Sequence, residues 1–326
     1  MGTLVERVGQ GQRRRQGQGP GHGQGQSLAA KPDSGAGRRA RARLADRVMT
    51  GVLWGLAAAL VAVLAAMILY LVGRGLSVIN WRFITSADVT GSYDGPEVFN
   101  TFYIVTLSLL ICIPLALGAA IYLVEYARQG RFVTAVRFAT ETLAGIPSII
   151  LALFGFLVFV TEFGHGTRFG FSRLAGALTL VILNLPLLLR VSEDALRGVS
   201  NELREASYAL GGNKLQTILR VLIPTSLPAL TTGIVLTAGK MIGETAALIY
   251  TAGGSSSVNG WLSLDPLTSG DTLTVKLYTI QSEGTMRNAL QIQNGTAALL
   301  ILLLLAFNLG LRFAAGALTR RFAGRR

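Results

Sequence analysis

The chain has 326 residues, of which 51% are hydrophobic and only 14% are charged, and its formal net charge is +13. Together with a mean hydropathy of +0.49, this composition argues against a water-soluble globular protein and indicates a polytopic membrane protein. The basic residues collect in the N-terminal tail and at the ends of apolar segments, which is not the distribution of a nucleic-acid-binding surface. The single cysteine, Cys112, excludes an intrachain disulfide and is interpreted as a small core residue.

The first segment, residues 1–44, is a basic tail rich in Gly, Gln and Arg. It contains too few apolar residues to offset the entropy of ordering, so we predict that it is disordered. It also lacks the apolar core of a cleavable signal peptide. We interpret the tail as topogenic and solubilising, in preference to a role in binding anionic lipid head groups or nucleic acid. A membrane domain is predicted over residues 45–318, followed by a short basic end over 319–326.

Six apolar segments are long enough to cross a bilayer, which requires about 20 helical residues for roughly 30 Å of hydrocarbon. In the third segment, Pro147 is expected inside the helix, because neighbouring helices or water can satisfy the carbonyl that it frees. The fourth segment is short, and Arg173 and Arg190 can extend its ends by snorkelling. The predicted spans are about 48–73, 98–124, 142–161, 174–190, 224–250 and 288–311.

The orientation follows from the basic residues that flank these segments. With six spans both termini lie on one side, and that side carries 23 of the 30 Lys and Arg residues, whereas the other side carries 6. Basic residues accumulate on the cytoplasmic side of membrane proteins. We therefore predict that both termini and the loop between the fourth and fifth spans, residues 191–223, are cytoplasmic.

This loop contains the stretch EASYALGGNKLQTILRVLIP, residues 205–224. Its hydrophobic spacing predicts two short amphipathic helices joined at Gly211 and Gly212, where glycine permits a sharp change of direction. Asn213 can cap the second helix, and Pro224 is tolerated at the first position of the next one. Small residues on the first helix would let another protein's backbone approach closely, although an ordinary amphipathic hairpin on the membrane surface is the alternative.

The same stretch resembles the cytoplasmic coupling loop of ABC-importer permeases. That pattern reads Glu-Ala-Ala, three residues, Gly, nine residues, then Ile-x-Leu-Pro, and its spacing is intact here. The departures are conservative, with Ser207 for Ala, Val221 for Ile and Ile223 for Leu. The resemblance assigns coupling with an ATPase subunit to Glu205, Ala206, Ser207, Gly211, Gly212, Val221, Ile223 and Pro224.

Lys240 and Glu244 are the two charged residues within a predicted span. Spaced i, i+4, they are expected to share one helix face about 6 Å apart along the axis. Charges inside a membrane face the bundle interior, a cavity or each other. One interpretation is an ion pair that only fixes helix packing. The other is an anion path, in which Lys240 meets phosphate and Glu244 accepts a hydrogen bond from the phosphate proton that sulfate lacks.

Further stretches resemble the A-type permease subunit of bacterial phosphate ABC importers, and the similarity covers about residues 48–315. In that family the basic residue four positions before the glutamate is usually arginine, whereas here it is Lys240. The stretches that carry the resemblance are FNTFYIVTLSLLICIPLALGAAIYLVEYA, LAGIPSIILALFGFLVFV, NLPLLLRVSEDALRGVSNELREASYALGG and GETAALIYTAG.

The resemblance implies an all-α type I ABC-importer permease with six transmembrane helices in the bacterial cytoplasmic membrane. Its implied partners are a homologous permease subunit, two ATPase subunits, an extracytoplasmic phosphate-binding protein, the lipid bilayer and inorganic phosphate. The sequence contains no GxxxxGK[ST] phosphate loop, so we expect ATP hydrolysis on another polypeptide and no enzymatic activity, cofactor, metal or nucleic acid for this chain.

Three other functions are compatible with part of the pattern. A secondary transporter could use Glu244 as a proton carrier, although the internal repeats usual in such folds are absent from the sequence. An importer for sulfate, molybdate or an organic solute would share the hairpin. A channel is the third alternative, and the sequence argues against it because it lacks the charged rings expected of a pore. The outer loop 251–287 is predicted to be either an interfacial segment or part of a docking surface for an external partner.

Overall fold

The structure, a computed structural model, describes residues 34–87, 92–161, 169–254, 261–283 and 288–323, which are almost entirely helical and contain no strand. This confirms the all-α fold. The helices are α1 (Ser34–Gly75), α2 (Trp81–Thr85), α3 (Gly95–Ile121), α4 (Arg131–Gly145), α5 (Ser148–Gly155), α6 (Arg173–Arg197), α7 (Asn201–Ala209), α8 (Lys214–Thr217), α9 (Ile223–Gly243), α10 (Ala246–Thr251), α11 (Leu273–Glu283) and α12 (Ala289–Ala323). Three π-helical turns, η1 (Tyr122–Tyr126), η2 (Phe156–Val160) and η3 (Ile218–Leu222), extend α3 and α5 and connect α8 to α9.

The chain divides into two units within α1, one ending at Ala62 and the other beginning at Val63. In the first unit the described side chains, residues 43–62, are all exposed, as expected for an apolar helix that meets lipid or another helix. α1 begins at Ser34, so residues 34–44, which are predicted to be disordered, are helical. Residues 1–33 of the predicted tail lie outside the described residues. Ala, Arg and Leu after Ser34 are strong helix formers, which extends the first span upstream.

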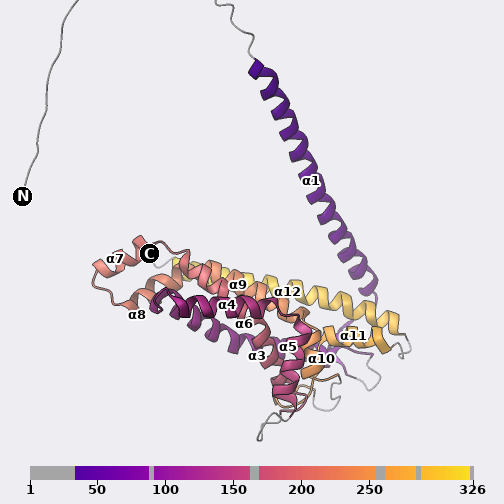
Figure 1. The fold of residues 1–326 in the computed structure, drawn as a ribbon. Coiled ribbons are helices and arrows are strands. Elements are labelled where there is room, and N and C mark those ends of the chain that lie inside the picture. Colours follow the sequence, from indigo (N-terminus) through magenta and orange to yellow (C-terminus); the bar gives the residue numbers. More distant parts are fainter. Residues whose placement is uncertain (1–33, 88–91, 162–168, 255–260, 284–287, 324–326) are drawn as a thin grey trace, which may run out of the picture. The chain divides into compact units, whose positions relative to one another are not determined.

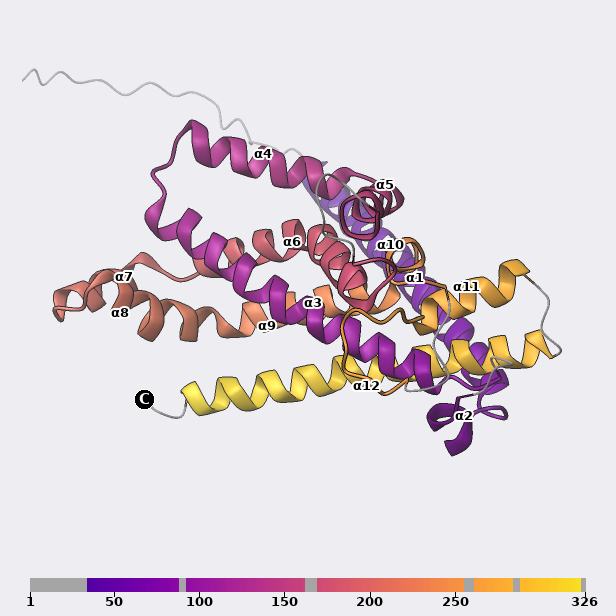
Figure 2. The same cartoon turned by 90° about the horizontal axis from the view of Figure 1, so that it is seen from below.

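In the second unit, α3, α6, α9 and α12 form a bundle in which α3 packs on α6, α6 on α9, and α9 on α12 (Figure 1). The α7–α8 hairpin and the last turns of α12 lie at one end of this bundle, and α2 and α11 lie at the other (Figure 2). Cys112 is fully buried in the core with Ile104, Leu180 and Met241, so its interpretation as a small core residue is confirmed.

Five helices among the described residues are long and apolar enough to cross a membrane, or six if the bent pair α4–α5 forms one span. The single helix predicted over 142–161 is instead broken, because α4 and α5 meet at an angle of 100°. Ile146 has an extended backbone with ψ of 133°, which is the conformation that a following proline imposes. Pro147 therefore ends one helix and precedes the next, and is not accommodated inside a continuous one.

The single helix predicted over 224–250 is also broken. α9 ends at Gly243, Glu244 is extended with ψ of 117°, and α10 follows as a short separate helix. The carbonyl of Glu244, which leaves the helical pattern, accepts a hydrogen bond of 3.3 Å from Thr274 on α11. At its other end, α9 continues directly from α8 through η3, so that Lys214–Gly243 is one span of 30 residues.

A buried charge cluster ties the beginning of α3 to α11 and α12, at the end opposite the hairpin. Lys276 Nζ lies 2.8 Å from Asp94 Oδ1 and 3.4 Å from Glu97 Oε1, and donates to the Tyr93 carbonyl at 2.6 Å. Thr296 donates to Asp94 at 3.2 Å. Burial raises the pKa of the Asp94 carboxyl, because loss of water disfavours its charged form, while Lys276 acts in the opposite direction. The cluster fastens the connections at this end of the chain's helices to the bundle.

Candidate functional site

The first arm of the hairpin, α7, ends in a Schellman motif. Gly212 N donates to the Ser207 carbonyl at 3.0 Å, and Gly211 N donates to the Tyr208 carbonyl at 2.9 Å. Gly211 has a φ of +82°, which is the left-handed conformation that this motif requires after the last helical turn. The predicted corner at Gly211 and Gly212 is therefore present, and these backbone bonds explain why it needs glycine.

Gly211→Ala is expected to destabilise the hairpin by about 1–2 kcal/mol, because a Cβ atom in the left-handed region approaches the following carbonyl. Hydrogen exchange of the amides around Ser207 and Thr217 measures this effect as faster local opening. Gly118→Ala is the matched control, since the new Cβ on α3 meets nothing within 4 Å. Equal protection in Gly211→Ala and the parent chain would contradict the strained corner.

The second arm begins with a capping box, as the position of Asn213 predicts. Asn213 Oδ1 accepts from Gln216 N at 2.8 Å, and Gln216 Oε1 accepts from Asn213 N at 3.0 Å. The two arms are joined by a hydrogen bond of 2.8 Å between Ser207 Oγ and Thr217 Oγ1. This bond gives a physical reason for serine at a position where the coupling-loop pattern has alanine.

The outward side of the hairpin is apolar and accessible. Ala206 and Ala209 are exposed small residues, Tyr208 is partly exposed, and Leu210 is 90% exposed at the tip. Glu205 adds an exposed carboxylate beside them. The arrangement offers a narrow, protruding surface that a concave partner can enclose.

The connection from the hairpin into α9 contains the last residues of the coupling-loop pattern. Pro224 has no N–H and cannot bond the carbonyl of Arg220, and the preceding turn, η3, is π-helical. Val221 in this turn and Ile223 at the start of α9 are half-buried, while Leu222 between them is fully buried in the core. The predicted positions Val221, Ile223 and Pro224 thus lie where the hairpin joins the bundle.

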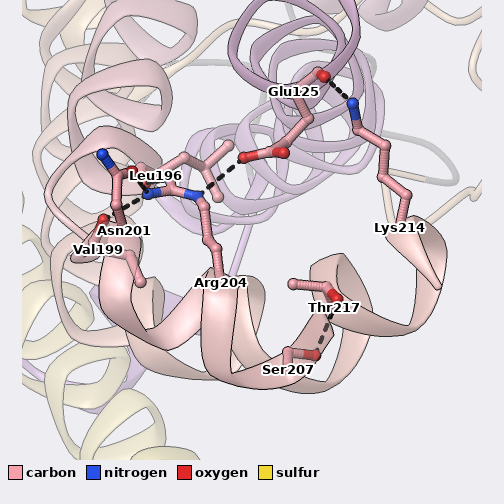
Figure 3. A network of polar contacts seen from close by, with 8 residues as sticks. All are labelled: Glu125, Leu196, Val199, Asn201, Arg204, Ser207, Lys214 and Thr217. Carbon is pink, nitrogen blue, oxygen red and sulfur yellow. Dashed lines mark hydrogen bonds and ion pairs between the residues drawn. The ribbon is translucent and has the colours of Figure 1, made fainter. Parts of the chain in front are cut away.

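Glu125, at the end of α3, holds both arms of the hairpin (Figure 3). Its Oε1 lies 3.2 Å from Arg204 Nε on α7, and its carbonyl accepts a hydrogen bond from Lys214 Nζ on α8. The side chains of Glu125 and Arg204 are only 9% and 14% exposed. Arg204 also donates to the carbonyls of Leu196 and Val199, at 2.9 and 2.6 Å, and so binds α7 to the end of α6.

These network residues were not singled out from the sequence as functional. Arg204 and Lys214 are separated from Glu125 by 79 and 89 residues, respectively. Each residue taken alone has the usual pattern of a charge at the end of an apolar segment. Only the packing of α3 against α6 brings the three together, so spacing along the chain carries no signal for this network.

Lys240 and Glu244 do not share a helix face. Lys240 is exposed in the last turn of α9, whereas Glu244 is partly buried beyond the end of that helix. No ion pair joins them in the part of the chain that the structure describes, so the interpretation of the two residues as an ion pair that fixes helix packing is not supported. They lie at the end of the span opposite the hairpin, and their role in a substrate path stays a prediction.

At the end of the bundle opposite the hairpin, Arg173 holds the loop 261–268 against the bundle. Its guanidinium lies 5.3 and 5.4 Å from the ring centroids of Phe99 and Tyr103, and donates to the carbonyls of Ser263 and Trp261. Tyr103 OH donates to the Leu264 carbonyl at 2.8 Å. The loop presents exposed leucines, but whether it docks a partner or meets lipid stays a prediction.

Comparison with known proteins places this fold and hairpin in one family. The model of the binding-protein-dependent transport system inner membrane component matches residues 112–324. The chain is 35% identical over 283 residues to the probable ABC transporter permease protein YqgI of Bacillus subtilis, covering 83% of this chain and 95% of that protein. It is 41% identical over 162 residues to the phosphate transport system permease protein PstA 1 of Mycobacterium tuberculosis, covering 50% of this chain and 51% of the relative.

A third relative, the phosphate transport system permease protein PstA of Mycobacterium leprae, is 37% identical over 221 residues and covers 67% of this chain and 69% of that protein. Among solved structures, a bacterial alginate ABC transporter matches with a TM-score of 0.59 and 18% identity, covering 86% of this chain and 96% of that one. The similarity to this structure supports the fold alone. The chain therefore belongs to the family of binding-protein-dependent transport system inner membrane components, which are permease subunits of ABC importers.

Proposed function

We propose that this chain is a membrane-spanning permease subunit of an ATP-driven importer for inorganic phosphate. The observation that carries the proposal is the protruding hairpin. It exposes the small residue Ala206 on its first arm and turns sharply at Gly211. Two relatives covering 50% and 67% of this chain are named phosphate transport permeases, which supports phosphate as the cargo. The subunit would work in the bacterial cytoplasmic membrane with both termini cytoplasmic.

In this proposal the hairpin seats in a groove of an ATPase subunit, and a homologous permease completes the path across the membrane. Two ATPase subunits hydrolyse ATP, and an extracytoplasmic phosphate-binding protein delivers the ion. Closure of the ATPase subunits moves the hairpin as a rigid body. Because α8 continues into α9 through η3, the movement passes to the helix that ends beside Lys240 and Glu244.

Co-purification of the full chain from native membranes tests the assembly. The associated polypeptides are expected to include a second permease, an ATPase with a phosphate loop and an external binding protein. Reconstitution into proteoliposomes then tests the energy source, because phosphate uptake should require ATP. Uptake driven by a proton gradient in the absence of nucleotide would replace the proposal with secondary transport.

Glu244→Gln is expected to weaken phosphate uptake several-fold while leaving assembly intact. The amide keeps the size of the side chain but removes the negative charge, so the group accepts a weaker hydrogen bond from the phosphate P–OH. Uptake of labelled phosphate by reconstituted complexes measures the effect, with Asp46→Asn on α1 as a control for an equivalent change at an exposed position. Unchanged uptake in Glu244→Gln would remove this residue from the path.

A further inference from the structure

A cavity of about 380 Å³ lies between α4 and the second half of α6. Its lining includes no residue of the hairpin and neither of the predicted path residues, Lys240 and Glu244. Arginines and carboxylates from both helices line it, and Arg197, at its rim, is also the last residue of α6 before the chain turns toward α7. The charged lining residues are Arg137, Glu141, Arg190, Glu193, Asp194 and Arg197.

Glu193 is the centre of this lining. Its side chain is only 10% exposed, and its Oε1 accepts from Arg137 Nε at 3.0 Å and from Arg137 Nη2 at 2.6 Å. Arg197 Nη2 approaches the same oxygen at 2.5 Å. All of these donors converge on Oε1, and Oε2 accepts no hydrogen bond from the described residues. The carboxylate is thus held in place with one oxygen saturated and the other available as an acceptor.

More guanidinium groups contact Glu193 than are needed to neutralise its carboxylate. The lining as a whole has three arginines and three carboxylates and is formally neutral, but Arg137 and Arg197 both contact Glu193, so two guanidinium groups meet one carboxylate at this point. Each guanidinium has five N–H donors, and most of them are not used by Glu193. Of the remaining charges, Glu141 pairs with Arg190 at 3.3 Å. Asp194 and Arg197 are both exposed, so water and salt screen these two charges alike, and Arg137 and Glu193 are the more buried members of the lining.

We propose that Arg137, Glu193 and Arg197 bind an oxyanion that carries its own proton, either hydrogenphosphate or a phosphate monoester. The free N–H groups of the two arginines would donate to unprotonated phosphate oxygens. Glu193 Oε2 would accept the hydrogen bond of the P–OH group. Sulfate has no such proton at neutral pH and would place an oxygen lone pair against the carboxylate, which disfavours its binding.

The identification of the ligand as cargo rests on the proposed function. The cavity adjoins the end of α6 that leads into the hairpin, so it would receive phosphate on the cytoplasmic side of the path. The same chemistry fits the head group of phosphatidic acid, which is a phosphate monoester. The binding site itself is inferred from Glu193 and the two arginines, independently of the direction of transport.

Binding of labelled inorganic phosphate to the full chain in nanodiscs of phosphatidylcholine tests the site. Arg197→Gln is expected to weaken binding at least about tenfold, because it removes a charge-assisted hydrogen bond. Arg197→Lys should recover part of the affinity, since it keeps the charge without the fork. Arg131→Gln, which makes the same change at an exposed position of α4 outside the cavity lining, is the control and should bind like the parent chain. Any binding at Lys240 is common to all variants and cancels in the comparison.

Glu193→Gln supplies a readout that a purely structural residue would not give. Unlabelled sulfate should fail to displace phosphate from the parent chain and should displace it from this variant, because the glutamine amide can donate to sulfate. Phosphatidic acid in the nanodiscs would compete with phosphate if the lipid is a natural source of the ligand, and would not compete if free phosphate alone is bound.

Equal affinity in the parent chain and Arg197→Gln, or an equal loss in Arg131→Gln, would overturn the site. Sulfate displacing phosphate equally well from the parent chain and from Glu193→Gln would overturn the role of the proton. The proposed function is judged separately by ATP-dependent uptake. If this binding persists in a chain that supports no phosphate uptake, the site stands and the transport proposal fails.

Discussion

Ala206→Asp is expected to abolish phosphate uptake without changing membrane insertion or the amount of chain in the membrane. Ala206 is exposed on α7, so aspartate is accommodated in the free subunit without a clash inside the fold. In the assembled importer the same position would be enclosed by the ATPase, where an unpaired charge costs several kcal/mol. The loss of even about 4 kcal/mol of binding free energy lowers affinity roughly a thousandfold.

Two measurements distinguish docking from folding in this variant. Pull-down of the ATPase subunit by the full chain should fail for Ala206→Asp, while the thermal unfolding of the detergent-solubilised subunit should match that of the parent. Ala206→Ser is the control, because it changes the side chain without adding a charge or much volume. An Ala206→Asp subunit that assembles with its ATPase and transports phosphate would show that the hairpin does not dock there.

Arg204→Met is expected to destabilise the connection between the hairpin and the bundle by about 3–5 kcal/mol. The change leaves the Glu125 carboxylate buried without its cation, and this is the costly way to break a buried ion pair. It also removes the donors to the Leu196 and Val199 carbonyls. The expected result is faster hydrogen exchange in α7 and a lower ratio of phosphate transported to ATP hydrolysed, because the hairpin would move without carrying α3.

The pair Arg190 and Glu141 provides the control for this prediction. It has a similar contact of 3.3 Å, but the side chains are 66% and 62% exposed, so Arg190→Met should cost less than about 1 kcal/mol. Adding Glu125→Gln to Arg204→Met should recover part of the lost stability, since no buried charge is then left unpaired. Similar losses for Arg204→Met and Arg190→Met would refute the importance of burial at Glu125.

The hairpin could be predicted in detail because its causes are local. Gly211 marks the left-handed corner, and Asn213 forms its cap with a residue three positions later, so both signals lie within a few residues of their effects. The all-α membrane fold was also predictable, since long apolar runs specify helices wherever no water can satisfy the backbone. Local structure that depends on residues only a few positions apart can therefore be predicted from this sequence.

The helix breaks at Ile146 and Glu244 could not be placed in the same way. Both lie within runs whose hydrophobicity alone supports one continuous span. At Ile146 the cause is local, since Pro147 imposes the extended backbone, but proline is also tolerated inside membrane helices and so does not by itself place a break. At Glu244 the conformation depends on a group elsewhere, Thr274, which donates to the Glu244 carbonyl. The break at Glu244 also places this residue beyond the end of the helix that carries Lys240, which the i, i+4 spacing alone does not indicate. The ion pairs of Glu125 and Glu193 depend on contacts between helices that are distant in sequence, and spacing does not report such contacts.

The continuity of Lys214–Gly243 makes this helix a lever. Its 30 residues give a length of about 45 Å at the usual rise of an α-helix. If the hairpin end pivots by about 5°, the far end swings by about 4 Å, which is of the size by which packed helices shift in switching proteins. A small tilt imposed at the hairpin end would thus widen or close a passage near the opposite end, provided that the π-helical turn η3 and Pro224 transmit the tilt without bending further.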